Sequence, residues 1–330
     1  MVSLEEIRQA HARLQGVAVR TPLIKFPRSI SATAPATRLW FKPENLQPIG
    51  AFKLRGAYNK IASLGQDDRL RGVITYSSGN HGQGVAYAAR ALAVQAIVVM
   101  PRNAPKIKIE STSALGAQIV FVGPSSAERQ SRAEEFARQH GYVIIPPYDD
   151  EQIIAGQGTV GLEIISDLPT VGCVLVPVGG GGLISGVATA IKLSDPQIKV
   201  IGVEPELAAD AQTSLRAGHI VDFPGEQTAR TLADGLRTQH LGVLNFEHIR
   251  RYVDDIVTVS EQEIRAAVRS LALDAKLVAE PSGAVAFAAY LFRGEELPKS
   301  DEIVAVISGG NIEPGLLAEI LLDNDHSARN

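Results

Sequence analysis

The sequence has a single cysteine among its 330 residues, so no disulfide can form within the chain. That residue, Cys173, lies in the apolar run CVLVPV, and we expect it to be a small buried hydrophobe. A chain without disulfides suits a reducing, intracellular compartment. The sequence also lacks any run of the ~18 apolar residues that a membrane-spanning helix needs. It begins MVSLEEIRQA, which is unlike an export signal, so we expect a cytoplasmic protein.

An excess of basic charge is absent as well. The 32 lysines and arginines face 36 aspartates and glutamates, which gives a formal net charge of -4. Such a chain has no positive field that would attract a nucleic acid or an anionic membrane surface, so we expect a small-molecule partner. Hydrophobic residues make up 45% of the chain and charged residues 21%, which excludes a disordered protein. The length predicts two domains of about 150 residues each.

Short apolar runs, rich in β-branched residues, alternate with segments of helical spacing. Continuous apolarity, rather than strict alternation, is typical of parallel strands that are buried on both faces. Segments between the runs, such as GVAYAARALA and EQEIRAAVRSLALDA, have the length and spacing of covering helices. The sequence therefore predicts an α/β fold. The runs are VITYS (73–77), AIVVM (96–100), QIVFV (118–122), VLVPV (174–178), VIGVE (200–204), DIVTV (255–259) and IVAVI (303–307).

Glycine-rich turns follow three of these predicted strands and open helices: SSGNHGQG, GGGGLISG and SGGNIEPG. In a parallel sheet such turns gather at the carboxyl ends of the strands, where ligands of open α/β folds bind. The run Gly179, Gly180, Gly181, Gly182 lets several backbone N–H groups point into one concavity at a helix start, which favours a phosphate. Tight packing of a strand against a helix is the alternative interpretation of the same glycines.

A nicotinamide dinucleotide is a further alternative for this run. Glu204 follows it by about twenty residues, as the ribose-binding acid of a dinucleotide fold does. However, a G-x-G-x-x-G pattern that starts at Gly179 places Ile184 at its third glycine, and one that starts at Gly180 places Ser185 there. A single phosphate therefore fits better than a dinucleotide.

One lysine stands in a setting that suits nucleophilic chemistry. Lys53 follows a Pro-Ile-Gly-Ala turn and is expected at the start of a helix, FKLRGAYNKIAS. The positive end of a helix and the apolar neighbour Phe52 both favour the neutral amine, which is the nucleophilic form. Standing alone, a lysine in this position is usually a solvated surface residue.

Taken together, the motifs resemble the fold type II pyridoxal-phosphate enzymes, specifically the threonine and serine dehydratases and the serine racemases. The blocks that match, in that family's order and approximate spacing, are KPENLQPIGAFKLRGA, SSGNHGQGVAYAA, IAGQGTVGLEI, PVGGGGLISG, GVEPELAADA, ADGLR, VDDIVTVSE, KLVAEPSGA and ISGGN. The resemblance implies two open, mostly parallel twisted sheets flanked by helices, with the cofactor between a large and a small domain. Residues 1–70 and 149–330 are expected in the large domain and 71–148 in the small one, with the crossing at PPYDD (146–150).

The resemblance also implies roles around pyridoxal 5'-phosphate. Lys53 matches the residue that holds the cofactor covalently, is displaced by the substrate amine and then takes the proton from Cα. Phe52 would stack on the pyridine ring, and Asn80 would donate to the ring hydroxyl. The glycines 179–182 and the amide of Leu183 would cradle the phosphate.

Ser308 matches the residue that hydrogen-bonds the pyridine nitrogen in this family. A serine hydroxyl, unlike a carboxylate, does not hold that nitrogen protonated, so the ring withdraws electrons less strongly. Long-lived carbanions are then disfavoured. This suits β-elimination, in which a hydroxyl leaves at once and the product hydrolyses to a 2-oxo acid and ammonia.

The loop that follows the predicted strand 73–77 matches the family's substrate-binding segment. Its members Ser77, Ser78, Gly79, Asn80 and His81 would hold the substrate carboxylate. His81 is explained equally well as a structural loop histidine. In racemases the serine that matches Ser78 exchanges a proton on the ring face opposite the lysine, although plain dehydratases carry it too. Arg129 matches a substrate-side position of the racemases, or is a solvated helix residue.

The block GVEPELAADA resembles a divalent-cation site of the family, with Glu204, the carbonyl of Ala208 and Asp210 as ligands. Two carboxylates and a carbonyl suit Mg²⁺, or Ca²⁺ or Mn²⁺, rather than zinc. Acidic residues around a turn are otherwise usually just solvated.

The sequence departs from the family at Ile49 and Ala51, where a threonine and a serine are common, so two hydroxyls near the lysine are absent. This leaves the preferred substrate open. Tyr148 stands where relatives vary, at the domain crossing, and either lines the pocket or merely packs. No further domain follows Asn330, so feedback by branched-chain amino acids through an appended domain is not expected.

The predicted function is the PLP-dependent dehydration of L-threonine and L-serine by a homodimer. A serine racemase with side dehydratase activity and a 3-hydroxyaspartate dehydratase are the alternatives within the family. The alternative outside it is a phosphate- or nucleotide-binding module without covalent chemistry, in which Lys53 would be incidental.

Overall fold

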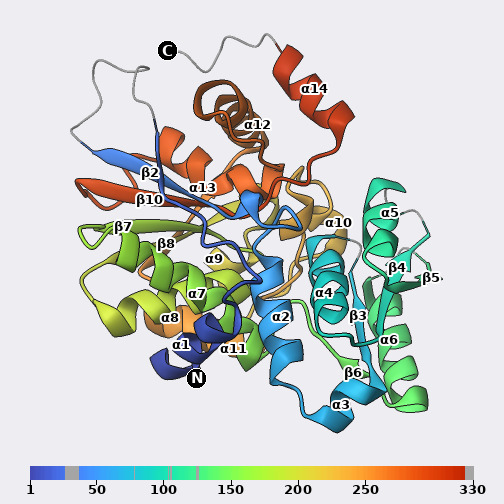
Figure 1. Ribbon diagram of the computed structural model, residues 1–330. Coiled ribbons are helices and arrows are strands. Elements are labelled where there is room, and N and C mark those ends of the chain that lie inside the picture. The colour runs from blue at the N-terminus through green and yellow to red at the C-terminus, as the bar shows by residue number, and fades with distance from the viewer. Residues whose placement is uncertain (27–36, 78, 103, 105, 124–125, 324–330) are drawn as a thin grey trace.

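The computed structural model of the chain describes residues 1–26, 37–77, 79–102, 104, 106–123 and 126–323 (Figure 1). It contains a six-stranded and a four-stranded sheet, both flanked by helices. Among the described strands, every pairing is parallel except the one between the first two. The predicted α/β fold with two open, mostly parallel sheets is confirmed.

The six-stranded sheet has the order β1-β2-β10-β7-β8-β9. Its strands are β1 (Ile24–Lys25), β2 (Arg38–Pro43), β10 (Glu302–Ile307), β7 (Cys173–Pro177), β8 (Lys199–Pro205) and β9 (Asp255–Val259). β10 lies between β2 and β7, so the last strand of the chain joins an early strand to the later ones. Cys173 is buried in β7, as expected.

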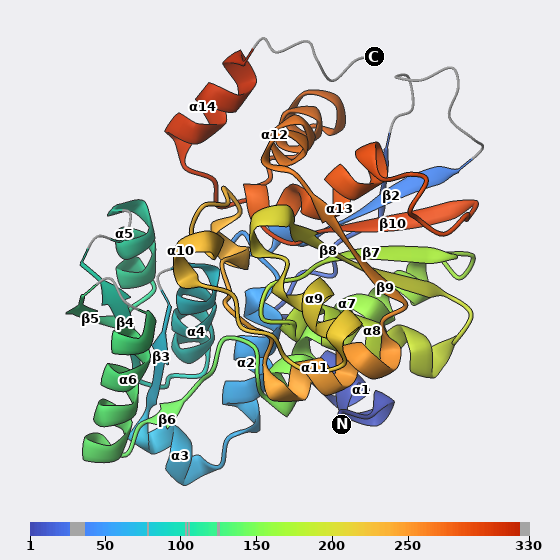
Figure 2. The ribbon, with the colours of Figure 1, turned by 180° about the vertical axis from the view of Figure 1, so that it is seen from behind.

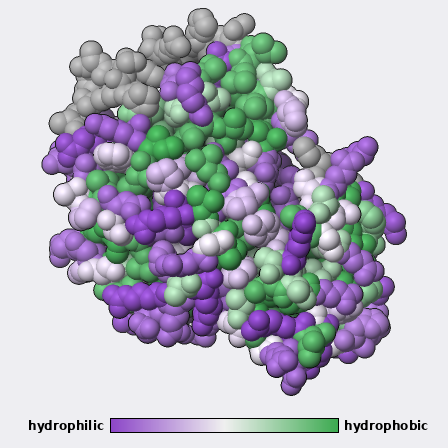
Figure 3. Space-filling model, viewed as in Figure 1, coloured by the Kyte–Doolittle hydropathy of each residue, from purple (hydrophilic) through white to green (hydrophobic). Residues whose placement is uncertain are grey.

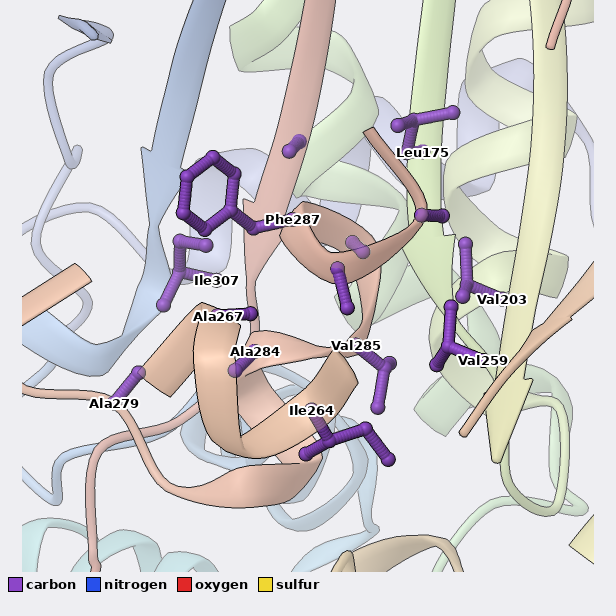
Figure 4. Packing of buried hydrophobic residues seen from close by; sticks show 14 of the residues in the cluster. Leu175, Val203, Val259, Ile264, Ala267, Ala279, Ala284, Val285, Phe287 and Ile307 are labelled. Carbon is purple, nitrogen blue, oxygen red and sulfur yellow. The ribbon is translucent and has the colours of Figure 1, made fainter. Parts of the chain in front are cut away.

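Helices cover both faces of this sheet (Figure 2). On one face lie α7 (Glu151–Asp167), α8 (Gly182–Ser194), α9 (Asp210–Ala217) and α11 (Val243–Tyr252), with α1 (Leu4–Arg13) packed outside α7 and α8. On the other lie α12 (Glu261–Ser270), α13 (Pro281–Phe292) and α14 (Pro314–Leu322). There Val285 and Ile264 pack near Val203 and Val259 (Figure 4). Burial on both faces explains why these strands are continuously apolar.

The four-stranded sheet has the order β5-β4-β3-β6. Its strands are β5 (Gln118–Val122), β4 (Ala96–Pro101), β3 (Val73–Tyr76) and β6 (Val143–Ile144). On one face pack α2 (Lys53–Ser63), α4 (Asn80–Ala91) and α5 (Lys106–Ala114), and on the other α6 (Ser126–His140). The shorter elements are α3 (Gln66–Arg71), α10 (Gly225–Thr228), three 3₁₀ turns η1 (Glu44–Leu46), η2 (Glu206–Ala208) and η3 (Asp234–Leu236), and a π-helical turn η4 (Leu271–Ala275).

The helix α2 lies between the two sheets, where it packs on α7 from one side and on α4 from the other (Figure 1). Its first residue is Lys53, as the sequence predicts. The helix that begins with the predicted nucleophile is therefore shared by both halves of the molecule.

Within the described part of the chain, no helix is both long and apolar enough to cross a bilayer. The face in Figure 3 mixes hydrophilic and hydrophobic residues without one continuous apolar band. All seven predicted strands are present, and β1, β2 and β6 are additional. The division into residues 1–70 with 149–330 and residues 71–148 stays a prediction.

Candidate active site

The carboxyl end of β10 holds the turn that precedes Lys53. The backbone N–H of Phe52 donates to the carbonyl of Ser308 over 3.1 Å, and Ala51 forms an isolated bridge with Gly309. Gly50 adopts φ +72°, a left-handed conformation that glycine takes without strain. Two motifs from opposite ends of the sequence, around Lys53 and Ser308, are thereby brought into contact.

The amine of Lys53 is enclosed where the two sheets meet. Its Nζ donates to the carbonyl of Pro147 over 2.7 Å and lies 5.2 Å from the centroid of the Phe52 ring. Burial lowers the pKa of Lys53 to about 8, because the charged ammonium loses its water. With that pKa, about half of the amine is neutral at pH 8. The side chain can therefore act as a nucleophile or a base near neutral pH.

The glycine run forms the start of α8, at the carboxyl end of β7. Gly181 adopts φ +95°, and a Cβ there would lie 2.8 Å from Cβ of Asn245. A Cβ on Gly180 would overlap the ring of Tyr148. Close packing, the alternative interpretation of the run, therefore accounts for glycine at these two positions.

The same run also suits an anion. In the part of the chain that the structure describes, the amide N–H groups of residues 179–183 donate to no protein acceptor outside their own helix. Gly182 and Leu183 form the first turn of α8, whose N–H groups have no partner within a helix. Amides at a helix start, beside a lysine with a lowered pKa, fit the phosphate and aldehyde of pyridoxal phosphate.

Ser308 follows β10 directly and is buried. Its hydroxyl donates to the carbonyl of Ser282 over 3.3 Å, and the Ser282 hydroxyl in turn accepts from the amide of Gly235 over 2.8 Å. The group at the end of this strand is a neutral hydroxyl and not a carboxylate. The sequence predicts that this hydroxyl bonds the pyridine nitrogen.

Asn80, the first residue of α4, is held by two residues of the other half of the molecule. Its Nδ2 donates to Oε1 of Glu280 over 2.6 Å, and its Oδ1 accepts from Nδ2 of Asn311 over 2.8 Å. Burial, reinforced by the nearby Asp234, raises the pKa of Glu280 to about 7. Lys108 of α5 forms an ion pair with Asp234. These contacts link the small sheet's helices to the large sheet's loops.

No role was predicted from the sequence for Glu280, Asn311, Asp234 or Lys108. The first three lie in the blocks KLVAEPSGA, ISGGN and ADGLR. Asn311 follows two glycines, Glu280 precedes a proline and Asp234 precedes a glycine, and these neighbours are the only signal that the sequence offered.

His81 is buried in the first turn of α4. Its Nε2 lies 3.0 Å from the carbonyl of Ile145, so the neutral tautomer carries its proton on Nε2. Burial, with a smaller effect of Lys53, lowers the pKa of His81 to about 3. His81 is therefore neutral at physiological pH, and its Nδ1, which has no hydrogen-bond partner among the described residues, is an acceptor.

The other residues predicted to bind the substrate are Ser77, Ser78, Gly79 and Arg129. The hydroxyl of Ser77 accepts from the amide of Gly79 over 3.3 Å. Ser78 lies outside the described residues. Arg129 is half-buried on α6, which packs on the face of the small sheet opposite to α2 and α4. The substrate roles of these residues stay predictions.

The predicted cation ligands meet where β8 leads into α9. Glu204 is the penultimate residue of β8 and accepts from the amides of Ala211 (3.0 Å) and Gln212 (2.8 Å). Neither carboxylate oxygen of Asp210 has a hydrogen-bond partner among the described residues, although both are buried. Burial raises the pKa of Asp210 to about 7 and that of Glu204 well above its usual value. Buried carboxylate oxygens that accept no hydrogen bond are suited to be ligands of a cation.

The buried residue Ala208 ends η2, between these two carboxylates. No cluster of three or more His, Cys, Asp or Glu side chains that could hold a metal occurs among the described residues. Any cation here would therefore rely on the two carboxylates, a backbone carbonyl and water.

Ile49 and Ala51, where the family commonly has hydroxyls, are buried against Leu54. They fill the space behind the lysine turn with apolar atoms. Tyr148 lies on the crossing segment, with its ring against Gly180, so it packs on the glycine run.

The family model of pyridoxal-phosphate dependent enzymes matches residues 14–309. The chain belongs to this family. It is 45% identical, over 97% of its length and 78% of the relative, to the L-threonine ammonia-lyase of Thermotoga maritima. It is 40% identical, over 93% of both chains, to the L-threo-3-hydroxyaspartate ammonia-lyase of Saccharomyces cerevisiae. The structure of maize serine racemase superposes with a TM-score of 0.91 at 38% identity, over 96% of both chains.

These similarities confirm the resemblance to the fold type II threonine dehydratases and serine racemases. The protein is a PLP-dependent enzyme.

Proposed function

We propose that this protein is an L-threonine ammonia-lyase that also dehydrates L-serine, forming a 2-oxo acid and ammonia. The observation that carries the proposal is the amine of Lys53: it is partly buried, its pKa is lowered to about 8, and its residue begins the helix that packs on both halves of the molecule. The 45% identity to an L-threonine ammonia-lyase over nearly the whole chain supports the substrate.

Each residue of the site has its own role in binding the cofactor or in moving the proton. Pyridoxal phosphate, when bound, withdraws electrons from Cα of the substrate. Lys53 binds the cofactor and takes the Cα proton on Nζ. The free amides of residues 179–183 bind the phosphate, and Ser308 presents its hydroxyl to the pyridine nitrogen. Asn80, oriented by Glu280, donates to the ring hydroxyl.

The start of α4 positions the substrate. The N–H groups of residues 77–82 bind the substrate carboxylate at the positive end of that helix. His81, which stays neutral, offers an acceptor rather than a positive charge. The apolar Ile49 and Ala51 lie behind the lysine turn and add no polar group there.

Serine racemase and 3-hydroxyaspartate ammonia-lyase remain the second candidates, because relatives with these activities are 38–40% identical. Ser78 is the residue on which racemisation would depend, as the acid or base opposite Lys53. A binding module without covalent chemistry is not favoured, since the chain belongs to an enzyme family.

A single assay separates these functions. The purified holoenzyme is given L-threonine, L-serine or L-threo-3-hydroxyaspartate, and 2-oxo acid and D-serine are measured together. We expect the highest kcat/KM for L-threonine, with 2-oxo acid as the main product from L-serine. D-serine formed faster than 2-oxo acid, or a higher kcat/KM for 3-hydroxyaspartate, would replace the proposal with the corresponding alternative.

We also propose that Glu204, the carbonyl of Ala208 and Asp210 bind Mg²⁺, or Ca²⁺ or Mn²⁺. Saturating Mg²⁺ is expected to raise the unfolding temperature of the wild type by a few degrees, since ligand at about 100 times its Kd stabilises by about 2.7 kcal/mol. Differential scanning fluorimetry with and without a chelator measures this shift. It should disappear in Asp210→Asn and persist in Asp222→Asn, which alters an exposed neighbouring acid. An equal shift in both variants would exclude the site.

The proposal includes a homodimer in the cytoplasm. Leu46, Leu273 and Val278 are large apolar residues that are about half exposed, and Nδ2 of Asn45 bonds the carbonyl of Val278, so η1 lies beside that segment. Apolar residues gathered in this way suit a subunit contact. Light scattering that gives the mass of one chain would contradict it.

A further inference from the structure

Four charged side chains are buried together behind the first turns of α2. Lys42, Glu44, Arg55 and Glu163 each expose between 0% and 3% of their side chains. We call them the buried charge cluster. Two cations face two carboxylates, so the cluster is neutral overall and each charge is paired, as burial demands.

Arg55 is the centre of this cluster. Its guanidinium makes two hydrogen bonds to Glu44, of 2.7 and 2.8 Å, and two to Glu163, of the same lengths. Further bonds reach the hydroxyl of Thr159 and the carbonyl of Val19. The planar guanidinium is thus tied to η1, to α7 and to the segment before β1, and paired bonds of this kind fix orientation as well as distance.

Lys42 belongs to the cluster in a different way. It lies on β2, and its Nζ bonds Glu163 (2.6 Å) and the carbonyl of Thr21 (2.7 Å). It therefore contributes to the charge balance through hydrogen bonds to Thr21 and Glu163, neither of which lies on α2.

Besides Arg55, two backbone N–H groups anchor the first turn of α2: that of Phe52 donates to the carbonyl of Ser308, and that of Gly56 donates to Oε1 of Gln157. The N-cap residue Phe52 makes no side-chain capping bond, although such a bond commonly holds a helix start. Further along, α2 and α7 meet backbone to backbone, because a Cβ on Gly156 would lie 2.6 Å from Cα of Gly56. Residues two positions apart in a helix point in roughly opposite directions. Arg55 therefore faces the cluster while Lys53 points toward the carbonyl of Pro147.

We propose that Arg55 is a positioning residue, which holds the first turn of α2 through the buried charge cluster and thereby aims the Lys53 amine at the cofactor aldehyde. This inference rests on the proposed role of Lys53. Buried ion pairs add little net stability compared with apolar residues of the same size, whereas their directional bonds specify one arrangement. A nucleophile such as the Lys53 amine has to be held in the right direction toward the atom that it attacks.

The test compares Arg55→Met with Lys42→Met. Each variant removes one buried cation and leaves one carboxylate in excess, but only Arg55 lies on α2. The probes are pyridoxal 5'-phosphate, which bonds covalently to the lysine, and 4'-deoxypyridoxine 5'-phosphate, which has the same ring and phosphate but no aldehyde. Dissociation constants come from equilibrium titration, and covalent attachment is measured by borohydride trapping.

We expect Arg55→Met to weaken pyridoxal phosphate binding by about tenfold or more, equivalent to about 1.4 kcal/mol. Binding of the deoxy analogue should change less than about twofold, and Lys42→Met should leave both constants near those of the wild type. Equal weakening of both probes in Arg55→Met, or the same loss in Lys42→Met, would overturn the inference.

If Arg55→Met does not fold, Arg55→Lys replaces it, because lysine keeps the charge but loses the paired bonds. The same selective loss of aldehyde binding is expected, and wild-type binding of both probes would again overturn the inference. A wild-type protein that binds no pyridoxal phosphate would refute the proposed role of Lys53 instead.

Discussion

Replacing Lys53 with alanine is expected to lower the rate of 2-oxo acid formation from L-threonine by about four orders of magnitude, because both the covalent attachment of the cofactor and the base for the Cα proton are lost. The variant should also lack the absorption band that borohydride bleaches in the wild type. Both are measured on protein saturated with pyridoxal phosphate.

Lys53→Arg is the control for charge at this position. Arginine keeps a cation at the start of α2, but its guanidinium stays protonated and cannot attack an aldehyde. It should be as inactive as Lys53→Ala. More than about 1% of wild-type activity in either variant would contradict the assignment of the nucleophile, since general acid–base catalysis alone accounts for about 100- to 10,000-fold.

Gly180→Ala is expected to weaken pyridoxal phosphate binding by about tenfold and to destabilise the fold by about 1–3 kcal/mol, as an overpacked site does. The added methyl group would overlap the Tyr148 ring, so either the crossing segment or the glycine run has to move. Pro147, next to Tyr148, is the acceptor of the Lys53 amine, so this movement would also disturb the lysine. Spectroscopic titration and urea unfolding measure the two effects.

Gly315→Ala provides the matched control for this prediction. Gly315 lies on the exposed face of α14, and a Cβ there would meet nothing within 4 Å. The same chemical change should therefore leave cofactor affinity and stability near wild-type values. If Gly180→Ala binds the cofactor as tightly as Gly315→Ala does, the glycine run has no role in holding it.

The strands illustrate what patterning can reveal. Seven apolar runs predicted strands correctly, because parallel strands covered on both faces must be apolar throughout. β1 and β6 were missed because they have two residues each. β2 was missed because it reads RLWFKP, and Lys42 is buried there only through its bonds to Glu163 and Thr21. No local pattern shows that a lysine will be neutralised by a distant carboxylate.

In the candidate site, too, the sequence shows the local motifs but not the contacts between distant residues. The motifs around Lys53, Gly179–Gly182 and Ser308 were recognisable because each combines a turn with a chemically distinctive group. The links between them were not: Glu280 orients Asn80 across 200 positions of sequence, and Asn311 does so across 231. Neither residue differs locally from an ordinary loop side chain.

The sequence by itself determined the fold class and the enzyme family, and it predicted which groups react, because apolar runs and motif order are properties of the chain. Only the tertiary structure decided the protonation and the hydrogen bonding of those groups. Burial lowers the pKa of Lys53 to about 8 and that of His81 to about 3, and within the described part of the chain the oxygens of Asp210 have no hydrogen-bond partner. The cost of removing a charge from water depends on everything packed around it, and that packing exists only once distant segments have met.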